Sequence, residues 1–471
     1  MTTLPASRKA RVAVVGGGLA GLAAGCALAE SGFQVTLFER RPFLGGRASS
    51  YQHPGTGEVV DNCQHVLLGC CTNLIEFYGR LGVGNKIRWY DQLTFLEPGG
   101  RTSVIGTSWL PAPLHTAPAF LRAECLGLKD KLAVAGAMAS LARSMPTDNG
   151  EAFLAWLQRH GQTETAIERF WKTILVSALN ETLDRVSVAY AAQVVRESFL
   201  KSAAAGRMGV PTVPLTELYG TAEAYISARG GEVRLRSGVD GFRPDSGSVT
   251  LSIAGNDVSF DCVILAASFD VLSRLLPQTP VAEPLRERLS HFESSPITGI
   301  HLWFDRQISD LDHAVLLDRT IQWMFHKSRL LAGTKSAAGS TGSYVELVVS
   351  SSKSLVEKSR QEIIELALEE LREFFPAAHD ANLMKSTVIK EVHATYSPRP
   401  GVDRYRPPNE TAWPRVFLAG DWTATGWPAT MEGAVRSGYR AAECVARVSG
   451  LTAVSFLQPD LPAAGFMRLF G

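Results

Sequence analysis

The stretch from Asp61 to Cys71, DNCQHVLLGCC, gathers several side chains that can take part in chemistry. Its first five residues offer a carboxylate, two amides, a thiol and an imidazole, and two adjacent cysteines follow an apolar run. Zinc sites usually use Cys and His pairs at short fixed spacings such as CxxC or HExxH. Here Cys63 and His65 are two positions apart, and neighbouring cysteines cannot readily turn towards one ion. We therefore expect no metal site in this stretch.

Asp61 and His65 are our candidates for catalytic side chains. Alternate residues of a β-strand point to the same face, so positions 61, 63 and 65 would share one face of a strand. A second interpretation fits the same residues, in which Asp61 caps a turn and His65 is a hydrogen-bonded histidine of the core. The choice between the two depends on what the rest of the chain places beside this stretch.

A strand, a helix and a second strand follow one another at the start of the chain. The β-branched run Arg11–Val15 is typical of a buried strand, Leu19–Glu30 is Ala- and Leu-rich and predicts a helix, and residues 34–39 predict a second strand. Between the first strand and the helix lies GGGLAG, residues 16–21, which carries the GxGxxG fingerprint. This complete βαβ unit predicts a dinucleotide-binding site.

The parts of this unit have separate physical roles. Gly16 allows the tight turn, Gly18 lets the backbone approach a pyrophosphate, and Gly21 allows close contact of helix and strand. The helix N-terminus at Leu19 supplies N–H groups to the phosphates. Glu39 ends the second strand, where its carboxylate accepts hydrogen bonds from ribose hydroxyls and repels a 2′-phosphate, so NADP is disfavoured. The predicted contacts are Gly16, Gly18, Leu19, Ala20, Gly21 and Glu39.

Two further motifs indicate a longer ligand. Arg40 opens the run RRPFLGGR, in which Gly45 and Gly46 let the chain pass close to a cofactor and Arg47 places a positive charge beside its diphosphate. Plain nicotinamide dehydrogenases do not need this addition after the ribose-binding acid.

The other motif lies near the C-terminus. A buried strand ends in Gly420 and Asp421, and that carboxylate can bind a polyhydroxyl chain. The next helix begins around Met431 to Ala434, where N–H groups can point at an electron-rich ring edge. Sites for opposite ends of one ligand, at opposite ends of the chain, imply an extended molecule. FAD meets that requirement.

Together these motifs resemble the amine-oxidase and phytoene-desaturase superfamily of flavoproteins. The resemblance implies FAD as the cofactor, with Val239 meeting the adenine through its backbone, Asp421 holding the ribityl chain and Met431 beside the isoalloxazine. It also implies an α/β fold. A Rossmann-like FAD-binding domain of the monoamine-oxidase/phytoene-desaturase type would be interleaved with an α+β substrate domain.

The expected domains are discontinuous. The FAD-binding domain takes residues 1–84, 206–295 and 395–450, the substrate domain with a helical cap takes 85–205 and 296–394, and 451–471 form a C-terminal tail. A chain of 471 residues is too long for one simple core, which fits two domains. Within them, residues 258–267 predict a strand. Residues 354–375 predict an amphipathic helix whose apolar face carries Ile364, Leu368, Leu371 and Phe375.

One branch of the superfamily matches the opening stretch. The squalene-associated FAD-dependent desaturases, also called hydroxysqualene dehydroxylases, resemble DNGQHVLLG there, and residues 61–69 match apart from Cys63 in place of glycine. Residues 394–396 and 426–433, ATY and GWPATMEG, are also similar to that branch. The resemblance implies that hydroxysqualene is reduced to squalene by hydride from reduced flavin, for hopanoid-type lipids in a bacterium. Such a reaction needs a proton donor for the leaving hydroxide and a dry pocket.

Three other functions remain open at this point. A carotenoid or phytoene-type desaturase would use the same fold with electrons flowing from substrate into FAD. An amine oxidase would also use it, although no amine-binding cage is evident. A prenyl-binding escort-type protein would carry an isoprenoid without reacting with it. The intact cofactor motifs argue against this last function.

Composition limits the binding partners and the cellular compartment that we expect for the protein. A formal net charge of +1 gives no electrostatic footprint for nucleic acid. Seven cysteines without a framework spacing predict reduced thiols, and residues 1–11 lack a signal-peptide pattern, so we expect a cytoplasmic protein. No window is long enough for a membrane span, but residues 109–120, expected as an apolar loop, and 456–470 carry large apolar side chains. Either one docks on the inner membrane to admit an apolar isoprenoid, or both fold onto the core. The electron donor is left open.

Overall fold

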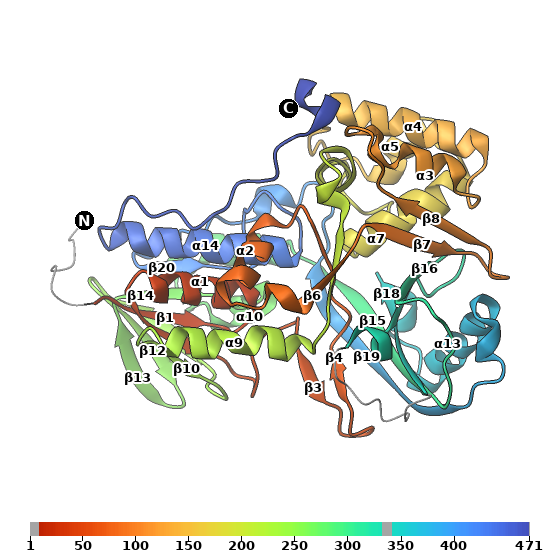
Figure 1. The fold of residues 1–471 in the computed structure, drawn as a ribbon. Helices are drawn as coiled ribbons and strands as arrows, with labels where there is room; N and C mark the ends of the chain where they lie inside the picture. Colours follow the sequence, from red (N-terminus) through yellow and green to blue (C-terminus); the bar gives the residue numbers. More distant parts are fainter. Residues whose placement is uncertain (1–8, 332–341, 471) are drawn as a thin grey trace.

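The computed structural model describes residues 9–331 and 342–470, so residues 1–8 of the predicted basic N-terminal segment lie outside the described part. Two large sheets organise the chain, and helices surround both of them (Figure 1). The first sheet has five strands and positions the predicted dinucleotide site. The second has seven strands and carries the predicted substrate domain.

The five-stranded sheet is parallel throughout, in the order β10-β2-β1-β14-β20. Its strands are β1 (Arg11–Val15), β2 (Gln34–Phe38), β10 (Glu232–Arg234), β14 (Cys262–Leu265) and β20 (Val416–Leu418). They come from all three chain segments that we expected to build the cofactor domain. The predicted strand over 258–267 is in fact two strands, because β13 (Asn256–Phe260) ends before Asp261 and β14 begins after it.

Helices cover this sheet tightly. α1 (Leu19–Glu30) is buried from Leu19 to Ala29, which explains why its sequence is apolar on every side. The last long helix, α14 (Met431–Val448), packs directly on it, since a Cβ atom on Gly438 would lie 2.2 Å from the carbonyl oxygen of Ala20. The helices α2 (Thr72–Arg80), α9 (Leu215–Ser227), α10 (Phe269–Leu275) and α11 (Glu283–Ser290) complete this half.

The seven-stranded sheet runs in the order β19-β15-β18-β17-β16-β7-β8. Its strands are β7 (Gln92–Leu96), β8 (Thr102–Gly106), β15 (Ser294–Phe304), β16 (His313–Leu316), β17 (Trp323–His326), β18 (Ser343–Ser350) and β19 (Leu383–Tyr396). The short α12 (Lys327–Leu330) follows β17, and α13 (Arg360–Phe374) packs beside β19. The buried face of α13 carries Ile363, Ala367, Leu371 and Phe374. Of the predicted face, Leu371 is buried in α13, Phe375 is buried just beyond its end, and Ile364 and Leu368 are partly buried against the same core.

A helical cap, residues 114–206, stands at one end of the seven-stranded sheet (Figure 1). It contains η2 (Leu114–Thr116), α3 (Ala117–Arg122), α4 (Leu128–Arg143), α5 (Phe153–Arg159), α6 (Glu164–Ala166), α7 (Thr173–Leu179) and α8 (Val188–Val195). Two π-helical segments, η3 (Ile167–Lys172) and η4 (Arg196–Leu200), continue α6 into α7 and extend α8. The predicted loop 109–120 thus ends in a helix, whose first turn accommodates Pro118.

Small sheets complete the fold. They are formed by β3 (Ser50–Gln52) with β4 (Val59–Asp61), by β5 (Leu67–Leu68), β9 (Met208–Pro211) and β6 (Ile87–Tyr90), and by β11 (Gly241–Pro244), β12 (Val249–Ile253) and β13. The prediction of one strand through residues 61–65 is wrong, because β4 ends at Asp61 and β5 begins only at Leu67. Asp61, Cys63 and His65 therefore do not share a strand face.

Candidate active site

A cavity of about 960 Å³ runs from the carboxyl ends of the parallel strands to the seven-stranded sheet. Ligands of open α/β sheets bind at these strand ends. The predicted cofactor residues that line the cavity are Gly16, Gly18, Leu19, Ala20, Glu39, Arg40, Gly45, Gly46, Arg47, Val239, Gly420, Asp421, Met431 and Ala434. Gly21 does not line it. A Cβ atom at Gly21 would lie 1.9 Å from the carbonyl oxygen of Gly16, which is the close approach of helix and strand that we expected of this glycine.

The glycine loop is shaped as a cradle for a diphosphate. Gly16 has φ +116°, a backbone conformation that L side chains rarely adopt, and a Cβ there would lie 2.6 Å from the carbonyl oxygen of Ala266. The second glycine motif lies against the first, since the N–H of Gly45 donates to the carbonyl oxygen of Gly17 at 2.9 Å. Both backbones therefore border the same part of the cavity without side chains in between, as a bound diphosphate requires.

Glu39 stands where β2 ends and is fixed by two backbone donors. The N–H of Gly17 donates to its Oε2 and the N–H of Arg41 donates to its Oε1, each at 2.7 Å. A carboxylate oxygen can accept more than one hydrogen bond, so Glu39 can still bind ribose hydroxyls. The residues present thus fit the adenosine end of FAD.

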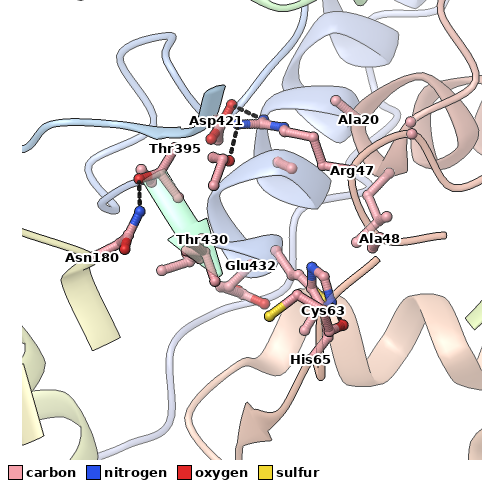
Figure 2. Close-up of a pocket in the computed structure, with 18 of the residues that line it drawn as sticks. Ala20, Arg47, Ala48, Cys63, His65, Asn180, Thr395, Asp421, Thr430 and Glu432 are labelled. Atoms are coloured by element: carbon pink, nitrogen blue, oxygen red, sulfur yellow. Dashed lines mark hydrogen bonds and ion pairs between the residues drawn. The ribbon is translucent and has the colours of Figure 1, made fainter. Parts of the chain in front are cut away.

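The N-terminal and C-terminal motifs meet in one ion pair. Arg47 donates through Nη2 to Oδ1 of Asp421 at 2.6 Å and through Nη1 to the carbonyl oxygen of Ala394 at 2.8 Å (Figure 2). The same arginine therefore contacts β19 of the substrate domain and the loop after β20. One oxygen of Asp421 is thus committed to Arg47, and the carboxylate is held at the cavity surface.

The start of α14 contains a buried acid that we had not predicted. Thr430 caps this helix by accepting the N–H of Gly433 at 3.1 Å. The next acid, Glu432, lines the cavity (Figure 2). It accepts from Leu74 N at 2.8 Å and from Arg436 Nε at 2.7 Å, and so ties α2 to α14. These partners come from the opposite end of the chain as well as from the same helix, and no local sequence signal pairs Glu432 with α2.

Asp61 lies behind the cavity wall, whereas we expected it at the reacting centre. Its Oδ2 accepts from Lys327 Nζ at 2.6 Å and its Oδ1 accepts from Ser50 Oγ at 2.6 Å. Lys327 also donates to Oε1 of Gln64 at 2.8 Å. Burial would raise the pKa of Asp61, but the Lys327 ammonium outweighs it and lowers the pKa below its usual range. The contacts of Asp61 are those of a buried ion pair that anchors the loop before His65.

His65 does line the cavity, together with Asn62, Cys63 and Gln64. Its Nδ1 lies 2.7 Å from the carbonyl oxygen of Cys63, so Nδ1 carries the proton and Nε2 is left as an acceptor. Removal from solvent lowers the pKa of His65. Figure 2 shows this histidine and Cys63 across the pocket from Asn180. The imidazole is therefore neutral and oriented at ordinary pH.

The end of the cavity away from the glycine loops is an apolar chamber. Its walls are Leu93, Phe95, Ile174, Val194, Phe199, Met208, Val315, Trp323, Phe325 and Val348. Polar side chains at this end of the cavity are hydrogen-bonded to one another. Trp323 Nε1 donates to Ser177 Oγ at 2.8 Å, and Asn180 Nδ2 donates to Thr395 Oγ1 at 2.9 Å. These walls come from separate segments of the chain, so the apolar chamber has no motif in the sequence.

The tail folds back onto the body of the protein. The N–H of Gln458 donates to Asn73 Oδ1 at 2.8 Å, and the N–H of Phe466 donates to the carbonyl oxygen of Ala112 at 2.8 Å.

No helix among the described residues has the length and apolar character of a membrane span. Within residues 9–331 and 342–470, no three His, Cys, Asp or Glu side chains are grouped to bind one metal ion. All seven cysteines are free thiols.

The known proteins that this chain resembles in sequence or in structure include desaturases and oxidases. The chain is 26% identical to the 15-cis-phytoene desaturase of Synechococcus elongatus over 92% of its own length and 95% of the relative. It is also 26% identical to the zeta-carotene desaturase of Synechocystis, over 92% and 97% of the two chains. Among solved structures, putrescine oxidase bound to putrescine shares the fold, with a TM-score of 0.72, 16% identity and coverage of 93% and 99%. An oxidoreductase from Methanosarcina mazei does so with a TM-score of 0.70, 17% identity and coverage of 91% and 98%.

A family profile also matches most of the chain. Residues 19–446 match the family described as flavin containing amine oxidoreductase. That range includes the end of the glycine loop from Leu19, Glu39, the Arg47–Asp421 pair and the start of α14, which are parts that fit FAD. The chain is therefore an FAD-dependent oxidoreductase and belongs to the flavin-containing amine oxidoreductase family.

Proposed function

We propose that the protein reduces hydroxysqualene to squalene in the biosynthesis of squalene and hopanoids. The observation that carries this proposal is the position of residues 62–68. This segment, which resembles the hydroxysqualene dehydroxylase branch, lines the same cavity as the cofactor motifs and the apolar chamber. The relatives support the substrate class, because their names are those of enzymes that act on phytoene and zeta-carotene, which are also long apolar isoprenoids.

The reaction breaks an allylic C–O bond and forms a C–H bond. The hydroxyl leaves as water after it gains a proton, and FAD, when bound in its reduced form, supplies the hydride. The side chains of the apolar chamber exclude water, which would otherwise capture a carbocation. While Nδ1–H donates to Cys63, Nε2 of neutral His65 can only accept a hydrogen bond, and it donates one after this nitrogen is protonated. We assign His65 as the group that passes the proton to the leaving hydroxyl.

Asp61 has a supporting part in this proposal. Its ion pair with Lys327, and the bond from Lys327 to Gln64, hold both ends of the turn that leads to His65. Asp61 is therefore a positioning residue, and His65 is the side chain of the pair that lines the cavity.

A second function is favoured by the names of the relatives. Phytoene and zeta-carotene desaturases remove hydrogen from their substrates, so electrons would flow from a polyene into FAD. The same cavity suits that reaction, because an apolar chamber and a dry cofactor site are needed in either direction. The two functions differ in which redox state of the enzyme reacts.

One anaerobic experiment separates the two. The purified holoenzyme, reduced with dithionite, is mixed with hydroxysqualene in detergent, and the oxidised holoenzyme is mixed in parallel with squalene and with phytoene. We expect the absorbance of oxidised flavin to return in the first mixture, with squalene in the extract. Bleaching of the oxidised enzyme by a polyene, without turnover of hydroxysqualene, would overturn the proposal in favour of a desaturase.

A further inference from the structure

An apolar surface covers the outer side of the helical cap. Among the described residues, eight of the fourteen exposed large hydrophobic side chains lie in two segments of this end of the protein. We name them the docking surface: Trp109, Leu114, Leu121, Leu128, Leu132, Phe466, Leu469 and Phe470. Trp109 is 90% exposed and Leu469 is 78% exposed, so neither contributes to the core. Figure 1 shows the C-terminal end of the chain at the same end of the molecule as α3 and α4.

Hydrogen bonds hold the two segments together. The tail is fixed to the loop before α3 by the bond from Phe466 N to Ala112 O, and to the cap by the bond from Ala464 N to Lys201 O at 2.9 Å. Met467, between the exposed residues of the tail, is fully buried. The docking surface is therefore a built feature of the fold, to which the tail and the cap both contribute.

The helix α4 adds an unusual outer face. A surface helix normally turns its polar side to solvent. On α4 the exposed positions include Leu128, Leu132, Ala135, Gly136 and Ala139, which recur with the period of a helix. The outer side of α4 is thus apolar along most of its length, and a large contiguous apolar face of this kind marks an interaction site.

Basic side chains accompany the apolar ones. Arg122 follows Leu121, Lys129 follows Leu128 and Arg468 precedes Leu469, and all three cations are exposed. None of the three forms an ion pair with another described residue. Apolar residues that insert into a bilayer, a tryptophan at its interface, and cations that meet anionic headgroups are the combination that binds a membrane surface.

The elements that carry the docking surface pack against elements that form the walls of the apolar chamber. Phe120 of α3 packs edge-on against Phe170 of η3, with ring centroids 5.4 Å apart, and η3 leads directly to Ile174 in the chamber wall. On the other side, Arg196 of η4 donates to the carbonyl oxygen of Phe470, and the next residue, Glu197, lines the cavity. The docking surface is thus joined to the chamber wall by one direct contact on each side, and both contacts involve a π-helical segment.

We propose that the docking surface binds the face of a bilayer that contains anionic phospholipid, with the helical cap against the membrane and the cofactor half away from it. The side chains of the surface enter the boundary between headgroups and acyl chains, and the three cations bind phosphate-bearing headgroups. The orientation places the apolar chamber next to the source of an isoprenoid substrate, a consequence that rests on the proposed function. The binding itself does not depend on it.

Flotation of the full-length holoenzyme with lipid vesicles tests the proposal. We expect the wild type to float with vesicles of phosphatidylethanolamine and phosphatidylglycerol, and to float more weakly with phosphatidylcholine alone. The variant Trp109→Glu/Leu469→Glu should lose at least about tenfold in partition coefficient, because each side chain adds a large buried apolar area in the bilayer. Arg122→Glu/Lys129→Glu should weaken binding to the anionic vesicles and leave phosphatidylcholine binding unchanged.

A matched control uses exposed apolar residues outside the docking surface. Val59→Glu/Met384→Glu places the same charges on β4 and β19 and should float like the wild type. All variants should reduce detergent-solubilised hydroxysqualene at the wild-type rate, a readout that fails separately if the proposed function is wrong. A wild type that stays with neither type of vesicle overturns the proposal. So does light scattering that shows a dimer dissociated by Trp109→Glu/Leu469→Glu, since the surface would then join two copies of the chain.

Discussion

Arg47 and Asp421 form an ion pair of 2.6 Å although 374 positions separate them in the chain. The arginine follows the second glycine motif, and the aspartate ends the strand–turn motif before α14. Each motif alone predicts contact with one part of a dinucleotide. Their direct bond shows that the fold brings both motifs to one place, with the side chain of Asp421 almost fully buried.

The first prediction concerns this pair. Arg47→Met removes the cation beside Asp421 and leaves a buried carboxylate without its partner, which costs about 1–3 kcal/mol. We expect the Kd of the apoprotein for FAD to rise by about tenfold or more. Titration of apoprotein with FAD, followed by flavin fluorescence, measures this Kd. As a control, Arg243→Met removes one partner of an exposed pair with Asp257 and should leave the Kd unchanged. An equal Kd for Arg47→Met would contradict the assigned position of FAD.

The second prediction concerns His65. His65→Gln keeps a polar side chain in the cavity wall but removes the group that carries a proton. We expect single-turnover oxidation of the reduced enzyme by hydroxysqualene to slow by about 10²-fold. Because the pKa of His65 is lowered by removal from solvent, the wild-type rate should rise as the pH falls, and the variant should lose that dependence. The control Cys63→Gly restores the residue typical of the resembling branch and should keep the wild-type rate. Full activity of His65→Gln would exclude it as the proton donor.

The third prediction concerns Lys327, whose side chain is 2% exposed. Lys327→Met leaves Asp61 buried and uncompensated, a change that costs about 3–5 kcal/mol in the free energy of unfolding. The double variant Lys327→Met/Asp61→Asn removes both charges and should recover part of that loss. Denaturation in urea at constant excess FAD measures the free energy of unfolding of the single and the double variant. Lys385→Met breaks a more exposed pair with Glu58 and should cost less than about 1 kcal/mol. If Lys327→Met costs no more than this control, the ion pair does not stabilise the loop.

The fourth prediction concerns Glu346, a second carboxylate 3.3 Å from Lys327. Burial raises the pKa of Glu346 from 4.5 to about 7. The Lys327 ammonium does not offset this effect, because Asp61 shares it and its own charge raises the pKa further. Folded Glu346 keeps its proton between these values while the unfolded chain has lost it. The unfolded state therefore binds fewer protons, and this residue's contribution makes stability fall as the pH rises from 4.5 to 7.

Glu346→Gln should remove that contribution. We expect the variant to equal the wild type near pH 4 and to exceed it by roughly 1–3 kcal/mol at pH 8, in free energies of unfolding from urea titrations. The exposed Glu369→Gln on α13 serves as the control and should follow the wild type at both values. A variant less stable than the wild type at pH 8 would show that Glu346 is ionised and bonded in the folded protein.

The parts of the site that were predictable from the sequence are those made by consecutive residues. Gly16, Gly21 and Glu39 owe their positions to one βαβ unit, so spacing alone places them. Asp421 follows from a strand end in the same way. The positions of β1, α1, β2 and β20 also followed from local apolar patterns, which report on burial directly.

Long-range contacts account for what the sequence did not reveal. Lys327 occurs in a segment without a motif, and its approach to Asp61 depends on the packing of α12 behind the loop. Glu432 was hidden for the same reason, because its partners in α2 are more than three hundred positions away. The strand predicted through residues 61–65 ends at Asp61, and beyond it the side chain of Asn62 donates to the carbonyl oxygen of Arg47 and to Glu391. Tertiary contacts of this kind override local alternation.

The packing of Gly438 on the backbone of Ala20 has a consequence for biosynthesis. The first βαβ unit leaves the ribosome early, yet the side of its helix that meets α14 stays uncovered, and its sheet lacks an edge strand, until β20 and α14 have been translated. Coenzyme capture must then come at the close of synthesis, and nascent chains arrested before residue 416 should remain colourless in the presence of FAD.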